Sequence, residues 1–311
     1  MDTRESARES ARESAGSQSA IGIVSDGKPG HLNQSLGLAD ALQRLCPGLA
    51  VQEIAAMSPG QAVAEFIAPG KPAQALGLLI AAGHATHLSL LALRRAHACP
   101  VIVLMRPSLP GAFFDLRIEP RHDGGVETPR CWISEGPLNR MQPANIRSEE
   151  GLILVGGPSP HFHWDDRTIV DQVTALCDGR RSWQLSGSRR TPESLMNALR
   201  DLTRPGLTVH EASALPPGWL AENLPRAAEC WVSPDSASMV YEALTAGCAV
   251  GVFKLSPSKN SRVVKAIDGL LAQEKLTAFE AFASGTVPTP PNTPFAEADR
   301  MAKRILDRGW L

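Results

Sequence analysis

Short apolar runs that alternate with longer helical patterns predict an α/β fold of two Rossmann-like, doubly wound domains that face a cleft. Alternation of this kind is typical of βαβ units and parallel sheets. The pattern stops once, around residues 139–150, where polar residues and a proline separate two apolar runs. A chain of 311 residues also exceeds the usual size of a single hydrophobic core. The sequence therefore predicts two consecutive domains.

The predicted domain limits follow these changes in pattern. Residues 1–18 are expected to be a disordered tail, because Arg-Glu-Ser-Ala recurs there three times and offers nothing to bury. The first domain covers residues 19–147 and the second covers residues 148–290. A proline-rich stretch then leads into residues 291–311, whose helix we expect to pack back on the first domain.

The individual elements follow from periodicity and from turn signals. Strands are predicted in the first domain at residues 20–25, 51–55, 75–82 and 100–105, with helices at 32–45 and 87–98. Strands are predicted in the second domain at 151–155, 182–186, 230–233 and 249–253, with helices at 167–177, 192–202 and 238–246. The last helix is predicted at 295–307.

Composition excludes several classes of partner. A formal net charge of -1 gives no overall attraction to nucleic acid. The six cysteines are scattered without a CxxC pair, which favours reduced thiols and a cytoplasmic protein. The apolar runs fall short of the roughly 20 residues that span a bilayer, so we expect at most peripheral contact with the inner membrane surface.

The first chemistry-bearing segment is SDGKPGH, residues 25–31, at the end of the first strand. It is neither a Walker loop, because Lys28 precedes a proline, nor a GxGxxG fingerprint. Gly30 and Lys28 lie where open α/β sheets bind ligands, and backbone can approach a ligand closely at a glycine. His31 is a candidate general base, and a polar capping role is the alternative.

The second segment is SPDSASMVYEAL, residues 233–244, where a strand ends and a helix begins. Amides around Ser236, Ser238 and Met239 could hold a diphosphate at the helix start. Glu242, four residues after Ser238, could accept hydrogen bonds from ribose hydroxyls. The alternative is a capped helix with a surface glutamate.

Glycine and basic residues near other strand ends complete the candidate ligand site. Ser188, Arg189 and Arg190 follow a predicted strand, and arginine suits phosphate oxygens. Gly157 ends another strand, and Lys259 adds a cation that could offset leaving-diphosphate charge. Solvated arginines and purely structural turns are the alternatives.

Two histidine pairs have spacings compatible with metal ligation. They are His161-x-His163, followed by Asp165, and His84-x-x-His87. Neither pair has a convincing third and fourth ligand nearby, so no metal site is expected.

Three of these motifs together resemble the mitochondrial fission ELM family of bacteria and plants. They are DSxSMxxEA at 235–243, DGKPGH at 26–31 and SRRTP at 188–192. The resemblance extends from about Ile21 to the last helix. Bacterial members are described as glycosyltransferases or as nucleoside-diphosphate-sugar epimerases. The family resembles GT-B enzymes more distantly, including the transferase that adds N-acetylglucosamine to the lipid-linked peptidoglycan precursor.

The resemblance implies a metal-independent GT-B glycosyltransferase with a nucleotide-diphospho-sugar as donor and no further cofactor. Glu242 would bind the ribose, and the amides of Ser236 to Met239 would lie near the diphosphate. His31 would face the hydroxyl of an acceptor, which could be lipid-linked and belong to cell-envelope glycan or lipid synthesis. Lys28 stands where the peptidoglycan enzyme has small residues, so the identity of its acceptor does not carry over.

Three rival functions remain at this point. An epimerase of nucleotide-sugars would use the same fold and similar donor contacts. A non-catalytic scaffold is compatible with the fission name of the plant members. A nicotinamide-dependent oxidoreductase could use Glu53 as its ribose-binding acid, although the GxGxxG fingerprint is missing.

Overall fold

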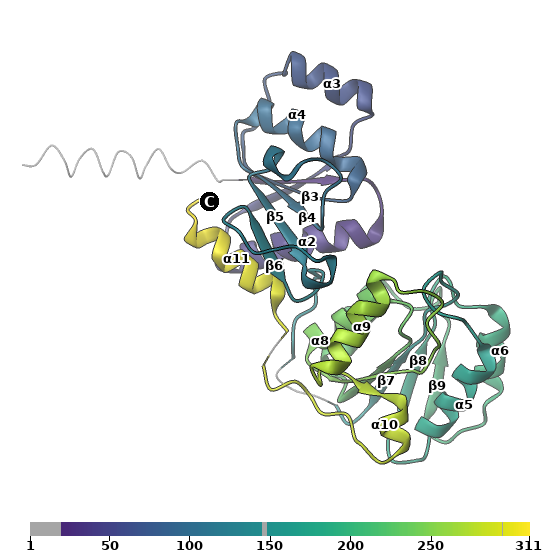
Figure 1. Ribbon diagram of the computed structural model, residues 1–311. Coiled ribbons are helices and arrows are strands. Elements are labelled where there is room, and N and C mark those ends of the chain that lie inside the picture. Colours follow the sequence, from purple (N-terminus) through teal and green to yellow (C-terminus); the bar gives the residue numbers. More distant parts are fainter. Residues whose placement is uncertain (1–19, 145–147, 294) are drawn as a thin grey trace, which may run out of the picture. The chain divides into compact units, whose positions relative to one another are not determined.

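The computed structural model describes residues 20–144, 148–293 and 295–311, which form two compact units (Figure 1). Unit 1 holds the described residues up to Arg140 together with Glu297–Leu311, and unit 2 holds Met141–Ala296. These limits lie a few residues from the boundaries at 147 and 290 that the sequence indicates. The tail predicted at 1–18 lies outside the described residues. Each unit is Rossmann-like, which confirms the predicted α/β class.

Unit 1 contains a six-stranded parallel sheet in the order β2-β1-β3-β4-β5-β6. Its strands are β1 (Ala20–Ser25), β2 (Ala50–Ala55), β3 (Leu76–Ala82), β4 (Val101–Leu104), β5 (Leu116–Pro120) and β6 (Cys131–Ser134). The strands β1, β3 and β4 are nearly continuous in apolar residues and are buried, as expected for a parallel sheet covered on both faces. The edge strand β2 is largely exposed.

Helices cover both faces of the unit 1 sheet. They are α2 (Pro29–Leu45), α3 (Pro59–Ile67), α4 (His87–His97) and α11 (Glu297–Asp307), with the 3-10 turns η1 (His84–Thr86), η2 (Gly111–Phe113) and η3 (Arg121–Asp123). Buried side chains of α2 and α11 share one core cluster, and those of α4 belong to the cluster on the other face. The C-terminal helix α11 packs against α2 and so belongs to unit 1 (Figure 1).

Unit 2 repeats this plan with the strand order β12-β11-β10-β7-β8-β9. Its strands are β7 (Gly151–Leu154), β8 (Trp183–Ser186), β9 (Leu207–His210), β10 (Glu229–Val232), β11 (Ala249–Val252) and β12 (Thr277–Ala278). Its helices are α5 (Asp166–Leu176), α6 (Glu193–Asp201), α7 (Trp219–Asn223), α8 (Ala237–Ala246), α9 (Arg262–Ala272) and α10 (Phe279–Ala283), with the 3-10 turn η4 (Leu224–Arg226). All its strand pairs are parallel.

The sequence-based elements differ from the structure in two ways. The sequence analysis predicted no counterpart of α3, β5, β6, β9, α7, α9, β12 and α10, and it placed the start of one helix too late, at residue 32. Helix α2 begins three residues earlier, at Pro29. Proline suits the first helical position because its fixed φ fits the helix and its missing N–H has no partner there. The carbonyl of Lys28 accepts the backbone N–H groups of His31 and Leu32, both at 3.0 Å. His31 therefore lies inside the first turn.

Candidate functional site

The strand order reverses once in each sheet, and the predicted motifs cluster at these two switch points. In unit 1 the reversal falls between β1 and β3, and in unit 2 it falls between β7 and β10. Loops leave the carboxyl ends of the two strands in opposite directions there, which makes the usual ligand crevice of an open α/β sheet. Each unit thus has its own candidate site.

In unit 1 a buried carboxylate holds the imidazole of His31. Nδ1 of His31 lies 2.9 Å from Oδ2 and 3.1 Å from Oδ1 of Asp26. Only 4% of the Asp26 side chain is exposed, against 25% for His31. Burial raises the pKa of Asp26, but hydrogen bonds from His31 and from the backbone N–H of Lys28 outweigh it and hold that pKa below its ordinary value. Asp26 is therefore ionised at neutral pH.

The ionised state of Asp26 decides which nitrogen of His31 can act as a base. A carboxylate only accepts hydrogen bonds, so Nδ1 of His31 carries the proton that it donates to Asp26. In the neutral form of the imidazole the lone pair is then on Nε2, which is the arrangement a general base needs. The sequence pointed to His31 but gave no reason to select Asp26, because contact between the two residues depends on how α2 follows β1.

Gly83, directly after β3, completes the surroundings of this pair. Its φ is 91°, and a Cβ at this position would lie 2.2 Å from Nδ1 of His31 and 3.0 Å from Oδ2 of Asp26. A side chain here would both strain the backbone and displace the imidazole. Gly83 therefore shapes the site by leaving room for the imidazole of His31.

A pocket of about 680 Å³ lies beside this pair at the carboxyl ends of β1, β2 and β3. Asp26, Ser58, His84 and Leu88 contribute to its lining. Lys28 is exposed at the neighbouring start of α2, where its side chain does not cap the helix. Gly30 is exposed in the first turn. The pocket offers both apolar surface and polar groups within reach of the Asp26–His31 region.

The pair of histidines with metal-like spacing in unit 1 has a different character. The ring centroids of His84 and His87 are 5.6 Å apart, and His87 is buried against Phe114. Burial, with a smaller contribution from His84, lowers the pKa of His87 to about 4. Within the described ranges, no group of three or more His, Cys, Asp or Glu residues is placed to hold a metal ion.

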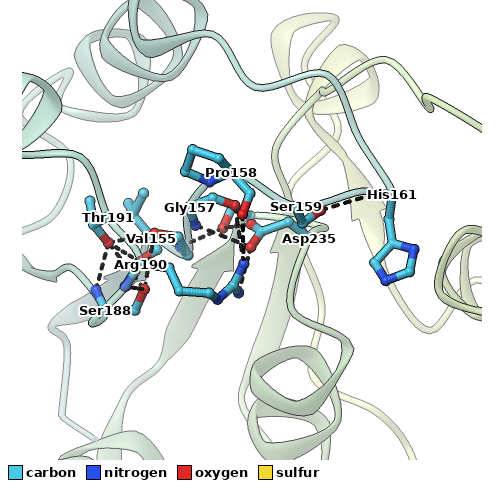
Figure 2. Close-up of polar contacts among 11 residues, drawn as sticks. Val155, Gly157, Pro158, Ser159, His161, Ser188, Arg190, Thr191 and Asp235 are labelled. Carbon is cyan, nitrogen blue, oxygen red and sulfur yellow. Dashed lines mark hydrogen bonds and ion pairs between the residues drawn. The ribbon is translucent and has the colours of Figure 1, made fainter.

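In unit 2 the buried carboxylate of Asp235 joins the loops that follow β7, β8 and β10 (Figure 2). Its side chain is 0% exposed. Oδ2 accepts the N–H of Gly157 at 3.1 Å and Nη2 of Arg190 at 2.8 Å. Oδ1 accepts the hydroxyl of Ser233 at 2.6 Å. One side chain therefore fixes three loops at the switch point.

Arg190 thus points inward onto Asp235, whereas the sequence analysis offered it as a phosphate ligand. Its Nη1 also donates to the carbonyls of Gly157 at 3.2 Å and Pro158 at 3.3 Å (Figure 2). A Cβ on Gly157 would lie 2.1 Å from the Arg190 carbonyl oxygen, so glycine is required for this close approach. Ser188 donates its hydroxyl to the carbonyl of Gly156 at 3.0 Å. Gly157, Ser188 and Arg190 therefore build the loops of the site.

The start of α8 presents unpartnered backbone amides beside this network. Ser236 is the N-cap residue, and its side chain makes no capping hydrogen bond. The first helical bond is from the N–H of Val240 to the Ser236 carbonyl, at 3.3 Å. Within the described part of the chain, the amides of Ala237, Ser238 and Met239 have no acceptor. Free amides with the helix dipole form a site that favours an anion such as a diphosphate.

Two further predicted residues lie elsewhere around this switch point. Glu242 is half-buried one turn inside α8, on the same helix face as Ser238. Arg189 lines a second pocket, of about 660 Å³, at the carboxyl ends of β8 and β9, where Arg200 and Glu211 form an ion pair. Sequence reasoning missed this pocket because β9 is short and only partly apolar, so its pattern was not recognised as a strand.

A segment after β7 crosses the end of β10. The N–H of His163 donates to the Ser256 carbonyl at 2.8 Å, and the N–H of Ser258 donates to the His161 carbonyl at 2.9 Å. These bonds join the loop after β7 to the loop after β11, and β10 lies between those strands in the sheet. Lys259 is exposed in the second of these loops. His161 and His163 therefore lie in a segment that links these two loops. The sequence analysis considered only their metal-like spacing.

The position of Glu53 speaks against the nicotinamide alternative. Glu53 is exposed in the middle of β2 and pairs in register with Ile23, away from the carboxyl end of the strand. A ribose-binding acid belongs at that carboxyl end.

No helix within the described ranges is both long and apolar enough to cross a membrane.

Comparison with known proteins identifies the family and the fold. The sequence profile described as Mitochondrial fission ELM1 matches residues 29–309. A comparison with curated proteins finds no match.

Among solved structures, the UDP-GlcNAc 2-epimerase from Neisseria meningitidis bound to UDP-GlcNAc is 9% identical, with a TM-score of 0.52 over 93% of this chain and 98% of that one. A protein assigned as UDP-N-acetylglucosamine 2-epimerase from Listeria monocytogenes is 11% identical, with a TM-score of 0.50 over 93% and 88%. The glycosyltransferase SnogD from Streptomyces nogalater is 16% identical, with a TM-score of 0.48 over 94% and 95%. At such identities the epimerases share the fold alone. The chain therefore belongs to the Mitochondrial fission ELM1 family, and its two parallel-sheet units give it a fold of the GT-B type.

Proposed function

We propose that this protein is a glycosyltransferase that moves a sugar from a nucleoside-diphosphate sugar to a hydroxyl acceptor. The observation that carries this proposal is the Asp26–His31 pair at the switch point of the unit 1 sheet. A scaffold has no need of a buried carboxylate that holds a partly exposed imidazole with its lone pair on Nε2. A transferase needs such a base, because a neutral hydroxyl is a poor nucleophile.

In the proposed reaction, Nε2 of His31 removes the proton of the acceptor hydroxyl as its oxygen attacks the anomeric carbon. The bond between that carbon and the diphosphate oxygen breaks, and the diphosphate leaves with the electron pair. Asp26 remains ionised and stabilises the imidazolium that forms, as the aspartate of a catalytic triad does. The proton held on His31 is then released to solvent.

The donor would bind to unit 2. The free amides of Ser238 and Met239 at the start of α8 would hold the diphosphate, and Glu242 would accept hydrogen bonds from the ribose. Arg189 and Lys259 would supply positive charge to the leaving group without a metal or another cofactor. Support for a nucleotide-sugar also comes from the Neisseria epimerase, which shares the fold and is bound to UDP-GlcNAc.

A panel of nucleoside diphosphates and their sugar conjugates, with NAD as a further ligand, tests the donor site by thermal shift. A ligand at 100 times its Kd stabilises the protein by about 2.7 kcal/mol. We expect one diphosphate and its sugar to stabilise the wild type and to lose this effect in Glu242→Ala. Glu222→Ala, which removes an exposed glutamate of α7, is the matched control. No response to any nucleotide would instead favour the scaffold, and a response to NAD alone would favour the oxidoreductase.

An epimerase is the second candidate, because the structures from Neisseria meningitidis and Listeria monocytogenes, with TM-scores of 0.52 and 0.50, are assigned to that activity. The two functions differ in their need for an acceptor. A change of the donor sugar when no acceptor is present would identify an epimerase. Transfer that needs an added acceptor, with the donor sugar otherwise unchanged, would identify the transferase.

A further inference from the structure

Helix α3 presents its apolar face to solvent instead of to the core of unit 1. Val63, Phe66 and Ile67 are 51%, 48% and 71% exposed. Their spacing of three and four residues places them on one face of the helix. The buried residue of α3 is Ala62. This is the reverse of the usual amphipathic helix, in which the apolar stripe faces the core.

The stretch of sequence around α3 is poor in charge. Among Asp, Glu, Lys and Arg, the 39 residues from 55 to 93 contain only Glu65 and Lys71, in a chain where these four types make up 20% of the residues. The carboxylate of Glu65 accepts the N–H of Gly70 at 2.9 Å and so caps the following loop. The guanidinium of Arg95 lies 5.5 Å from the ring centroid of Phe66, and Lys71 is exposed after the helix. An apolar face is thus accompanied by two cationic side chains.

The α3 face also adjoins the pocket beside the Asp26–His31 pair. Pro59, the first residue of α3, lines that pocket, and so does Leu88, a 42% exposed residue of α4. The helices α3 and α4 pack against each other (Figure 1). Apolar surface therefore extends from the α3 face toward the pocket.

We propose that the α3 face docks on an anionic lipid bilayer, with Val63, Phe66 and Ile67 inserted among the acyl chains and with Lys71 and Arg95 at the headgroups. Apolar side chains of this kind enter the boundary between headgroups and acyl chains, and nearby cations favour anionic lipids. A second copy of the chain fits this face less well. Three partly exposed side chains offer on the order of 300 Å², whereas a stable interface buries about 800 Å² on each partner.

Docking in this orientation would bring a lipid-linked hydroxyl to the pocket beside Asp26. That part of the inference rests on the proposed glycosyl transfer. Binding to the bilayer itself needs neither a donor nor an acceptor, so the two can be tested separately.

Flotation with vesicles of phosphatidylglycerol and phosphatidylethanolamine, without nucleotide, tests the docking. The wild type should float, and Phe66→Gln combined with Ile67→Gln should weaken vesicle partitioning at least about tenfold. Phe113→Gln combined with Val126→Gln is the matched control, because those residues are similarly exposed at 49% and 75%. The control should float like the wild type.

Three results would overturn the inference. They are a wild type that stays unbound, an α3 variant that floats like the wild type, and a wild-type dimer that the α3 variant converts to a monomer. The last result would assign the face to self-association. The nucleotide thermal shift of the same variant should equal that of the wild type, which also shows that the variant folds. A wild type that floats but ignores every nucleotide would refute the proposed transfer and leave the docking intact.

Discussion

Replacing Asp235 should destabilise unit 2 far more than replacing an exposed acid of the same unit. Asp235→Ala removes a fully buried carboxylate that accepts hydrogen bonds from Gly157, Arg190 and Ser233. A buried donor that loses its acceptor costs about 1 to 3 kcal/mol, and the hydrogen bonds from Gly157 and Ser233 are buried, whereas the side chain of Arg190 is 46% exposed. We expect a loss of about 4 kcal/mol for Asp235→Ala and about 2 kcal/mol for Asp235→Asn, which keeps one acceptor oxygen.

Urea unfolding followed by tryptophan fluorescence measures this loss. Four of the six tryptophans, at positions 164, 183, 219 and 231, belong to unit 2, so the signal reports mainly on that unit. Glu280→Ala is the control, because it breaks the exposed ion pair between Glu280 and Lys254 at 3.0 Å. We expect this control to change the free energy of unfolding by less than about 1 kcal/mol.

A double-mutant cycle with Arg190→Ala tests the same reasoning more closely. The coupling energy between Asp235 and Arg190 should be about 2 kcal/mol, in the range measured for contacting residues. The reasoning would be refuted if Asp235→Ala lowered the free energy of unfolding by less than about 1 kcal/mol, or if the coupling energy were near zero. Either result would mean that the three loops are held in place without this carboxylate.

Three further predictions concern catalysis and pH. Asp26→Asn should lower turnover at least about 100-fold with little change in donor binding, because an amide can favour the wrong tautomer of His31; equal loss of both would contradict the base role. Transfer should continue after chelation with EDTA, and activity that returns only with added Mg²⁺ would count against metal-independent chemistry. Stability should fall as the pH drops from 6.5 toward 4, because unfolded His87 then gains a proton that the folded residue, with its pKa of about 4, does not bind. Above 6.5 both states are neutral and the effect vanishes. The free energy of unfolding should fall by about 2 kcal/mol, which is less than the full pKa shift would give, because solvent screens part of the effect of burial. In His87→Gln, the decrease in stability between pH 6.5 and pH 4 should be smaller by this amount.

Most of the fold could be predicted from the sequence because it depends on local patterns. The buried strands β1, β3 and β7 appear as apolar runs, and the glycines and proline after β1 and β7 mark where these strands end. The elements without a prediction include β5, β6, α3, α9 and β9, and two of them, α3 and β9, have weak local patterns. Helix α3 turns its apolar face outward, and β9 is only partly buried, so neither shows the usual relation between apolar residues and the core.

The sequence by itself determined the α/β class, the two consecutive halves and the segments that lie at the strand ends, because periodicity and turn chemistry act between neighbouring residues. It also indicated His31 and the start of α8. Only the tertiary structure decided that Asp26 holds His31 and that Arg190 points inward onto Asp235. These contacts depend on how helices follow strands and on loops up to 78 residues apart in the sequence. Packing across the sheet therefore decides which polar groups stay free to bind a ligand.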